Sequence, residues 1–393
     1  MRLILATQGT YGDHLPMAGL ASTLKQRKFE VRLACNPAMH SLARRSDVDP
    51  ITFGEALGPS ESSANPLCWD HWQNPPVNQK WTEENCRVLR EQYESLVNIL
   101  RPGDVLVGCR NQYMLSLVAQ VCGCQWLEVG LNCGSMIDYK RLPMARNSSH
   151  PWKHGLDQLE AQLRQEFLGN SNNQQDPDPL LRLHAVPDMF AAFDYPQVNA
   201  IRTGFWCWQD PQWQDWKPPL AVERALKNEP PPLGLVFSSQ PLHNPQKILA
   251  QHLEVAELLG LSLILVRGWA FHEDKNLGSL IDHPALIIMD PLPLPWLLSR
   301  LSAVFVHGGI GTLAEAIRAD CQVVVEPFGN DQFLNARLAL QQGLALAVHP
   351  HRFNPTIVAK ALMTQVNTRT SMQEPSMFAG LSVAATEIEK CLK

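Results

Sequence analysis

The sequence lacks any run of eighteen consecutive apolar residues, and it has no long stretch of basic side chains. Because a transmembrane helix needs about 20 mostly apolar residues, no segment is expected to span a membrane. A formal net charge of −5 at pH 7 without a basic run argues against nucleic acid as a partner. Residues 1–7 become polar too early for a signal peptide, and they predict instead a first buried strand in a cytoplasmic protein.

The sequence also lacks the spacing patterns of metal sites and of several enzyme classes. Its ten cysteines include no Cys-x-x-Cys pair, and Cys122 and Cys124 have no second pair beside them. We therefore expect no metal and no other cofactor, and we expect reduced thiols. No G-x-S-x-G motif supports a serine hydrolase, and residues 9–12 depart from the G-x-G-x-x-G motif of dinucleotide-binding proteins.

What is present is an alternation of short apolar segments with longer helical patterns, which predicts α/β domains with parallel sheets. Helices are expected at 16–27 and at about 111–121 in the first half. Strands are expected at 3–6, 31–34, 104–107 and 126–129, and then at 233–237, 261–266, 285–289, 303–306 and 322–325.

The composition changes in the middle of the chain, where tryptophans and prolines cluster over residues 206–232. Proline clusters around a short helical pattern are typical of a segment between domains. We therefore predict a first domain over 1–215, a proline-rich linker over 216–232 and a second domain over 233–393.

Residues 55–82 form a long segment rich in Gly, Pro, Ser and Asn, and the segment also carries tryptophans. Structureless loops of this length are uncommon in compact domains unless they are functional. The loop, with Asp70 and His71, either lines a binding pocket or is a surface loop that its tryptophans anchor.

The most informative segment is the glycine turn at 307–312, which follows the apolar strand Ala303–Val306 and precedes a helical pattern near Thr312. Glycines let backbone N–H groups approach a ligand, and a helix N-terminus carries partial positive charge. The turn is thus suited to a phosphate or pyrophosphate, with His307 as an additional donor. The alternative is a tight strand-to-helix turn without a ligand.

A second strand-to-helix transition follows at Asp331 and Gln332. A carboxylate only accepts hydrogen bonds, whereas an amide both donates and accepts, so the pair is suited to sugar hydroxyls. The alternative role for Asp331 is that of a helix cap. Phosphate binding at one turn and hydroxyl binding at the next indicate a sugar phosphate.

These segments resemble those of the family 1 glycosyltransferases with the GT-B fold, and especially bacterial antibiotic and sterol-type members. The matching segments are Thr7–Pro16, Phe237–Ser239, Arg267–Trp269, Pro291–Trp296, His307–Thr312 and Phe328–Gln332. The resemblance implies two doubly wound Rossmann-like domains that face each other across a cleft. The first would bind the acceptor and the second the nucleotide sugar, with the last helix packing back on the first domain.

The resemblance also implies which residues of the second domain bind the donor. They are Ser239, Arg267, Pro293, His307, Gly309, Gly311, Thr312, Asp331 and Gln332. Ser239 is equally suited to starting a helix, and Arg267 could pair with a carboxylate instead of a phosphate. Pro293 lies in the segment that passes the nucleobase in members of the family. Prolines there prevent a helix, so backbone groups are left free to contact the edge of the base.

In the first domain the G-D-x-x-P pattern places Asp13 where relatives carry the catalytic base, and His14 is its rival. Asp13 could also cap a helix that starts near Pro16. The resemblance implies an inverting transfer of a hexose from a UDP- or dTDP-sugar to a hydroxyl of a small apolar or lipid-like acceptor, and it leaves peripheral membrane contact open. The alternatives are a sugar-nucleotide epimerase and a non-catalytic nucleotide-sugar-binding protein of the same fold.

Overall fold

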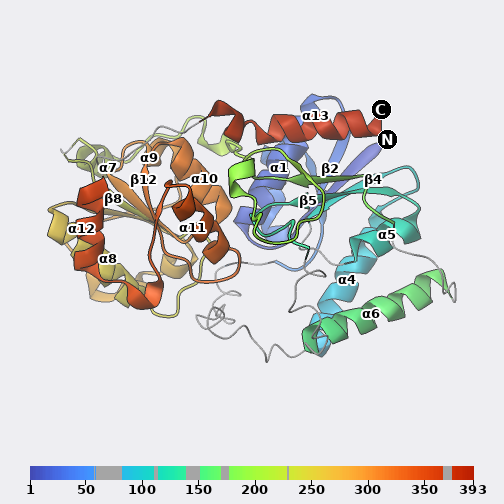
Figure 1. Cartoon of the computed structure of the whole chain (residues 1–393), viewed down its shortest axis with the longest axis horizontal. Coiled ribbons are helices and arrows are strands. Elements are labelled where there is room, and N and C mark those ends of the chain that lie inside the picture. Colours follow the sequence, from blue (N-terminus) through green and yellow to red (C-terminus); the bar gives the residue numbers. More distant parts are fainter. Residues whose placement is uncertain are drawn as a thin grey trace. The chain divides into compact units, whose positions relative to one another are not determined.

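The computed structural model describes residues 1–56, 58, 82–109, 114–138, 151–169, 177–227, 230–365 and 374–393. Asp70 and His71 lie outside these residues, so their place in an acceptor pocket stays a prediction. The chain forms two compact units (Figure 1). The first includes residues 1–56, the described part of 82–210, and Ala379–Lys393, and the second includes Pro211–Phe378.

The first unit is built on a parallel sheet in the order β3-β2-β1-β4-β5-β6-β7. Its strands are β1 Arg2–Ala6, β2 Glu30–Cys35, β3 Asp49–Thr52, β4 Val105–Cys109, β5 Gln125–Gly130, β6 Leu181–His184 and β7 Ile201–Arg202. Its α-helices are α1 Tyr11–Gln26, α2 His40–Arg45, α4 Glu83–Ile99, α5 Leu115–Cys122, α6 Pro151–Leu168 and α13 Gly380–Leu392.

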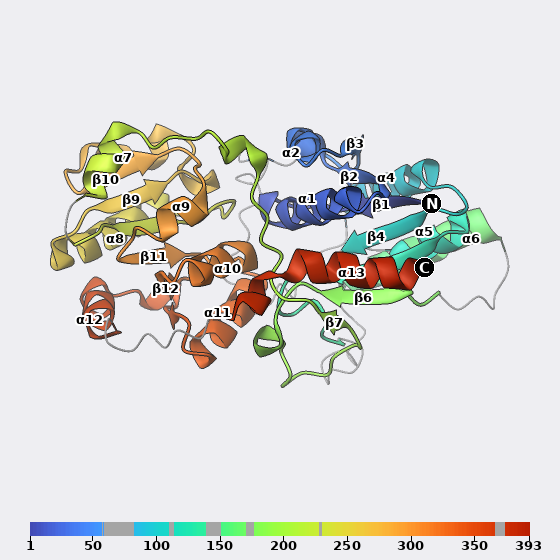
Figure 2. The same ribbon diagram turned by 90° about the horizontal axis from the view of Figure 1, so that it is seen from above.

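Helices cover both faces of this sheet, because alternate strand residues are buried on opposite sides. Leu3 and Leu5 of β1 belong to a core shared with α1, α2 and α13, whereas Ile4 belongs to a core shared with α4, α5 and α6. The C-terminal helix α13 packs along α1 (Figure 2). Gly19 of α1 allows this approach, since a Cβ there would come within 2.9 Å of Leu381 Cδ1 on α13.

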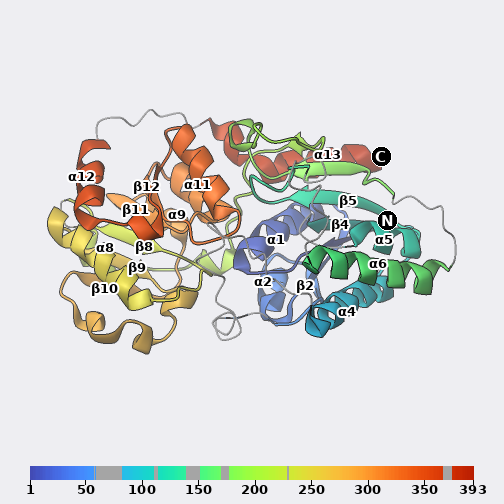
Figure 3. The same cartoon turned by 60° about the horizontal axis from the view of Figure 1, so that its bottom comes forward.

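The second unit is built on a parallel sheet in the order β10-β9-β8-β11-β12-β13. Its strands are β8 Leu233–Val236, β9 Leu263–Val266, β10 Leu286–Met289, β11 Ala303–Val306, β12 Gln322–Val325 and β13 Leu346–Ala347. Its α-helices are α7 Leu220–Ala225, α8 Pro245–Leu259, α9 Leu294–Leu298, α10 Ile310–Arg318, α11 Gln332–Gln341 and α12 Pro355–Gln365. Helices α8 and α12 pack side by side (Figure 3).

The predicted α/β class with two Rossmann-like parallel sheets is confirmed. The predicted helix start at Pro16 is wrong, because α1 begins five residues earlier at Tyr11 and includes Pro16 in its interior. Thr10 and Asp13 form a capping box there, and this local signal fixes the helix start. The short strands β3, β6, β7 and β13 were not predicted.

Every helix in the described part of the chain is too short or too polar to cross a membrane.

Candidate functional site

Three adjacent strands of the second sheet, β8, β11 and β12, end at the same edge. Val306 at the end of β11 is in register with Val236 of β8 and with Val325 of β12. The loops that follow these strands carry the predicted serine segment, the glycine turn and the Asp331–Gln332 segment. Ligands of open parallel sheets bind at the carboxyl ends of strands, so this edge is the candidate site of the second unit.

The three glycines of the turn differ in whether the surrounding protein leaves room for a side chain. Gly308 has φ +91°, and a Cβ there would come within 2.8 Å of Val325 Cγ1. A Cβ on Gly309, the N-cap of α10, would lie 2.4 Å from His307 Nε2. A Cβ on Gly311 would meet no atom within 4 Å. Packing therefore explains the first two glycines, whereas no packing contact explains Gly311, whose contact with a ligand stays a prediction.

His307 is half-buried beside this turn. Burial lowers the pKa of His307 to about 4, so its imidazole is neutral at pH 7. The backbone of Val236 opposes this shift in the pKa of the ring, although Nδ1 is buried and makes no hydrogen bond of standard geometry with the described residues. A neutral imidazole carries one donor and one acceptor nitrogen, so His307 can offer a single hydrogen bond to a phosphate oxygen.

The loop after β8 is held against the glycine turn by hydroxyl groups. Ser238 Oγ lies 3.3 Å from Thr312 Oγ1 in the first turn of α10. Ser238 adopts φ +46°, and its carbonyl oxygen accepts a hydrogen bond from the N–H of Trp269 at 2.9 Å. Gly268 permits this contact, because a Cβ there would lie 2.1 Å from the Ser238 carbonyl oxygen. The predicted Ser239 is the next residue and is half-buried.

Asp331 precedes α11, but its side chain makes no capping hydrogen bond to that helix. Its Oδ2 instead accepts a hydrogen bond from Asn335 Nδ2 at 2.7 Å. Burial raises the pKa of the Asp331 carboxyl, while the Asn335 hydrogen bond lowers this pKa. The alternative of a simple helix cap therefore does not account for Asp331, whose contact with a sugar stays a prediction.

Gln332 is buried, and its amide makes hydrogen bonds within the protein. Its Oε1 accepts from the N–H groups of Phe328 at 2.8 Å and Gly329 at 3.2 Å. Its Nε2 donates to Gln240 Oε1 at 2.7 Å, which ties the loop after β12 to the loop after β8. Gln332 thus orders the loop that carries Asp331, and its predicted hydroxyl contact relies on the remaining Nε2 hydrogen.

Arg267 and Pro293 are engaged within the protein. The Arg267 guanidinium donates to the carbonyl oxygen of Phe271 at 3.0 Å and pairs with the carboxylate of Asp274, which is the alternative to a phosphate contact. Pro293 is the N-cap of α9, and its carbonyl oxygen accepts from the N–H of Trp296 at 3.0 Å. The donor contacts of Arg267 and Pro293 stay predictions.

In the first unit, the loop between β1 and α1 folds the Asp13 carboxylate back on the turn. Asp13 Oδ2 accepts a hydrogen bond from the N–H of Thr10 at 2.9 Å, so Asp13 takes part in capping α1. Gly9, with φ +109°, leaves room for this carboxylate, since a Cβ there would lie 2.3 Å from Oδ2. Asp13 is half-buried, so the residue retains some access to solvent.

His14 is fully enclosed, with 0% of its surface exposed. Its Nδ1 lies 2.8 Å from the carbonyl oxygen of Thr10, and a carbonyl only accepts, so Nδ1 carries the proton. Nε2 is buried without a hydrogen-bond partner in the described part of the chain. Burial lowers the pKa of His14 to about 4, which leaves a neutral ring in the core. Of the two candidate bases, only Asp13 reaches the surface.

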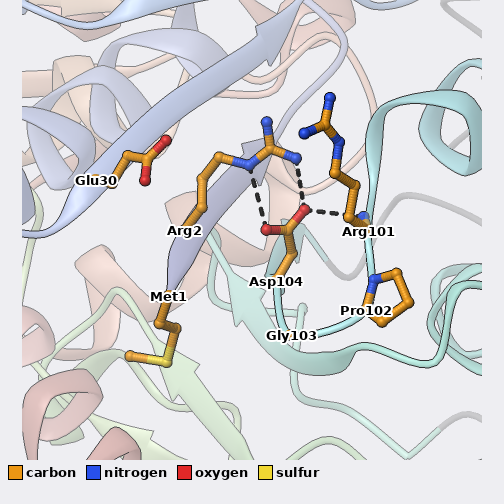
Figure 4. Close-up of a pocket in the computed structure, with 7 residues that line it drawn as sticks. All are labelled: Met1, Arg2, Glu30, Arg101, Pro102, Gly103 and Asp104. Carbon is orange, nitrogen blue, oxygen red and sulfur yellow. Dashed lines mark hydrogen bonds and ion pairs between the residues drawn. The ribbon is translucent and has the colours of Figure 1, made fainter.

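A pocket of about 410 Å³ lies at the opposite, amino-terminal edge of the first sheet (Figure 4). An ion pair of 2.6 Å between Arg2 and Asp104 ties β1 to the residue before β4. Asp104 also accepts from the N–H of Arg101 at 2.9 Å. These contacts explain the polar lining as a structural link between strands, at the edge of the first sheet opposite to Asp13 and His14.

We call the edge of the second sheet where β8, β11 and β12 end the donor edge. Two of its residues were not predicted from the sequence. Ser238 joins the site through its positive φ and its contact with Thr312, which depend on the tertiary structure. Asn335 follows Asp331 by four residues, a spacing that places two side chains on the same face of a helix. That spacing was a usable signal for Asn335.

No protein-family model matches the chain, but comparisons with known proteins find similar sequences and similar solved structures. The sequence is 32% identical over 416 aligned positions to the O-mycaminosyltylonolide 6-deoxyallosyltransferase of Streptomyces fradiae, covering 98% of this chain and 94% of the relative. A sterol 3-beta-glucosyltransferase of Kluyveromyces lactis is 28% identical over 191 positions, covering 46% of this chain and only 15% of the relative.

The fold is likewise that of a solved glycosyltransferase. The structure of glycosyltransferase VinC in complex with dTDP superposes with a TM-score of 0.66 at 17% identity, covering 100% of this chain and 95% of the other. At this identity the likeness concerns the fold alone, and it assigns the two sheets to the GT-B fold. With the near-complete match to the Streptomyces enzyme, the chain belongs to the family 1 glycosyltransferases.

Proposed function

We propose that this glycosyltransferase moves a hexose from a dTDP- or UDP-sugar to a hydroxyl of a small apolar or lipid-like acceptor, with inversion at the anomeric carbon. The observation that carries the proposal is the donor edge of the second sheet. Gly311, which no packing contact explains, lies there in the first turn of α10, beside Thr312, whose hydroxyl contacts that of Ser238. The relatives supply the acceptor class, because one glycosylates a mycaminosyltylonolide and another a sterol.

The diphosphate of the donor is proposed to lie at the N-terminus of α10. Backbone N–H groups at a helix start are unsatisfied and favour anions. The N-cap residue of α10 is Gly309, so no side chain accepts a hydrogen bond from these N–H groups. The neutral imidazole of His307 adds one further donor. These groups would stabilise the charge that develops on the diphosphate as the bond from C1 to oxygen breaks. Asp331 would accept hydrogen bonds from the sugar hydroxyls.

Asp13 is proposed as the general base. As the acceptor oxygen attacks C1, its proton passes to the Asp13 carboxylate, and the nucleoside diphosphate leaves with the electron pair of the broken bond. Attack opposite the leaving group inverts the anomeric configuration in a single step. His14 is a weaker candidate, because it is enclosed and its only acceptor atom, Nε2, is buried. No metal is required by this proposal.

The donor assignment predicts that nucleoside diphosphates stabilise the protein. A ligand that binds only the native state raises the melting temperature. We expect UDP or dTDP to raise the melting temperature. We expect His307→Ala to weaken the binding of that nucleotide by about 1–3 kcal/mol, the typical cost of losing a buried hydrogen bond. Thermal shift and isothermal titration calorimetry against a panel of nucleotides measure both effects. The absence of a shift with any nucleoside diphosphate at millimolar concentration would overturn the donor assignment.

A matched pair of glycine substitutions separates ligand contact from packing. Gly311→Ala meets open space, so we expect native stability to be kept or raised by up to about 1 kcal/mol through helix propensity, while nucleotide affinity falls. Gly268→Ala drives a Cβ into a backbone carbonyl, so we expect a loss of stability of about 1–3 kcal/mol. Urea denaturation and nucleotide titration of both variants test this. Unchanged affinity in Gly311→Ala would remove the turn from the site.

A further inference from the structure

Asn335 connects the two halves of the candidate donor site through one amide group. Its side chain is fully buried in the first half of α11. Its Nδ2 donates to the carbonyl oxygen of Gly308 at 2.9 Å and to Asp331 Oδ2 at 2.7 Å. Both neighbours only accept hydrogen bonds, so the orientation of the amide is fixed by chemistry, and both Nδ2 hydrogens are used.

The oxygen of the same amide, Oδ1, is buried and has no hydrogen-bond partner among the described residues. An unsatisfied buried oxygen is unfavourable, and an apolar side chain of similar size, such as leucine, would fill the space without that penalty. The amide is therefore explained by what Nδ2 holds rather than by packing.

The two groups that Nδ2 joins come from different loops. Gly308 belongs to the turn after β11, and its positive φ brings it so close to α11 that a Cβ would lie 3.1 Å from the carbonyl oxygen of Gln332. Asp331 belongs to the loop after β12. Asn335 thus fixes the separation between the turn proposed for the diphosphate and the carboxylate proposed for the sugar.

We propose that Asn335 is a positioning residue that holds the Asp331 carboxylate at a fixed distance from the glycine turn, so that the site discriminates a nucleotide sugar from the free nucleoside diphosphate. This inference rests on the proposed function. The amide does not touch the substrate, and it acts through Asp331. Its contribution is a gain in affinity that appears only when the hexose is attached to the nucleotide.

The test compares Asn335→Leu with wild type and with Asp331→Ala, using calorimetric titration with a nucleoside diphosphate and with its hexose conjugate. In Asn335→Leu we expect the preference for the conjugate to fall by about 10-fold or more, the scale of a hydrogen bond to a charged group, with nucleoside diphosphate affinity within about 2-fold of wild type. In the double variant the loss should equal that of Asp331→Ala alone, since both act through the same carboxylate.

Two further variants keep the test decisive. Asn335→Ala lacks the donors and introduces no new atoms into the site, so it should lose the preference as well even if the leucine variant is poorly folded. Asn244→Ala removes a hydrogen bond that caps α8, away from this contact, and it should lower stability without changing the preference. Equal losses for both ligands, additive losses in the double variant, or an unchanged preference would each overturn the inference. If wild type binds neither ligand, the proposed function itself fails.

Discussion

Asp13→Asn is expected to lower kcat by about 100-fold or more, because it removes the carboxylate that accepts the acceptor proton. The substitution keeps the shape of the side chain, and its amide oxygen can still accept the hydrogen bond from the N–H of Thr10 that orders the start of α1. Nucleotide affinity should change little, since the diphosphate is assigned to the second unit. Steady-state kinetics with saturating donor, together with nucleotide titration, measure the two effects.

The matched control for this prediction is His14→Asn. An asparagine amide can donate to the carbonyl oxygen of Thr10 as Nδ1 does, while the free Nε2 is lost. We expect His14→Asn to retain most of the activity. If His14→Asn abolished turnover while Asp13→Asn remained active, the roles of the two residues would have to be exchanged. If neither variant lost activity, the acceptor would be activated by another group.

The second large effect is expected in the core of the second unit, where His252 on α8 faces Glu326 at the end of β12. His252 Nε2 lies 3.1 Å from Glu326 Oε2, and the two side chains are 0% and 1% exposed. His252 Nδ1 lies 2.7 Å from the carbonyl oxygen of Ile248, which only accepts, so Nδ1 is the donor of that hydrogen bond and Nε2 is the ring atom that faces Glu326. The His252 ring packs edge-on against the ring of Phe305, with 4.5 Å between the two ring centroids.

Removing one member of this pair leaves the other buried without its partner. We expect His252→Leu or Glu326→Leu to destabilise the protein by about 3–5 kcal/mol, whereas the double leucine variant should cost much less than the sum. Urea denaturation of the three variants gives the coupling free energy. Additive effects would show that the two groups do not depend on each other.

The parts of the fold that the sequence predicts well are the buried central strands. The expected strands Ala303–Val306 and Gln322–Val325 coincide with β11 and β12, because each is a short apolar run that ends at polar or glycine residues. The edge strands β3 and β7 were missed, since β3 contains Asp49 and Pro50 and β7 has only two residues. Such strands depend on pairing with a neighbour rather than on their own composition.

The candidate site was predictable where local chemistry decides it, and not where packing does. The turn at 307–312 and the segment at Asp331 could be identified from residue types alone. The enclosure of His14 and the internal pairing of Arg267 depend on neighbours brought together by the fold. The helix start was predicted at Pro16 because proline is typical of a first helical position, whereas the capping box of Thr10 and Asp13 starts the helix at Tyr11.

The central claim is an inverting transfer of a sugar from a nucleotide to an acceptor hydroxyl. It is tested most directly by incubating the protein with a dTDP- or UDP-hexose and an apolar alcohol, such as a macrolide aglycone or a sterol, and by identifying the products by mass spectrometry and proton NMR. We expect acceptor-dependent release of the nucleoside diphosphate and a glycoside whose anomeric configuration is opposite to that of the donor. A glycoside with retained configuration, or a sugar epimer formed without any acceptor, would contradict the claim.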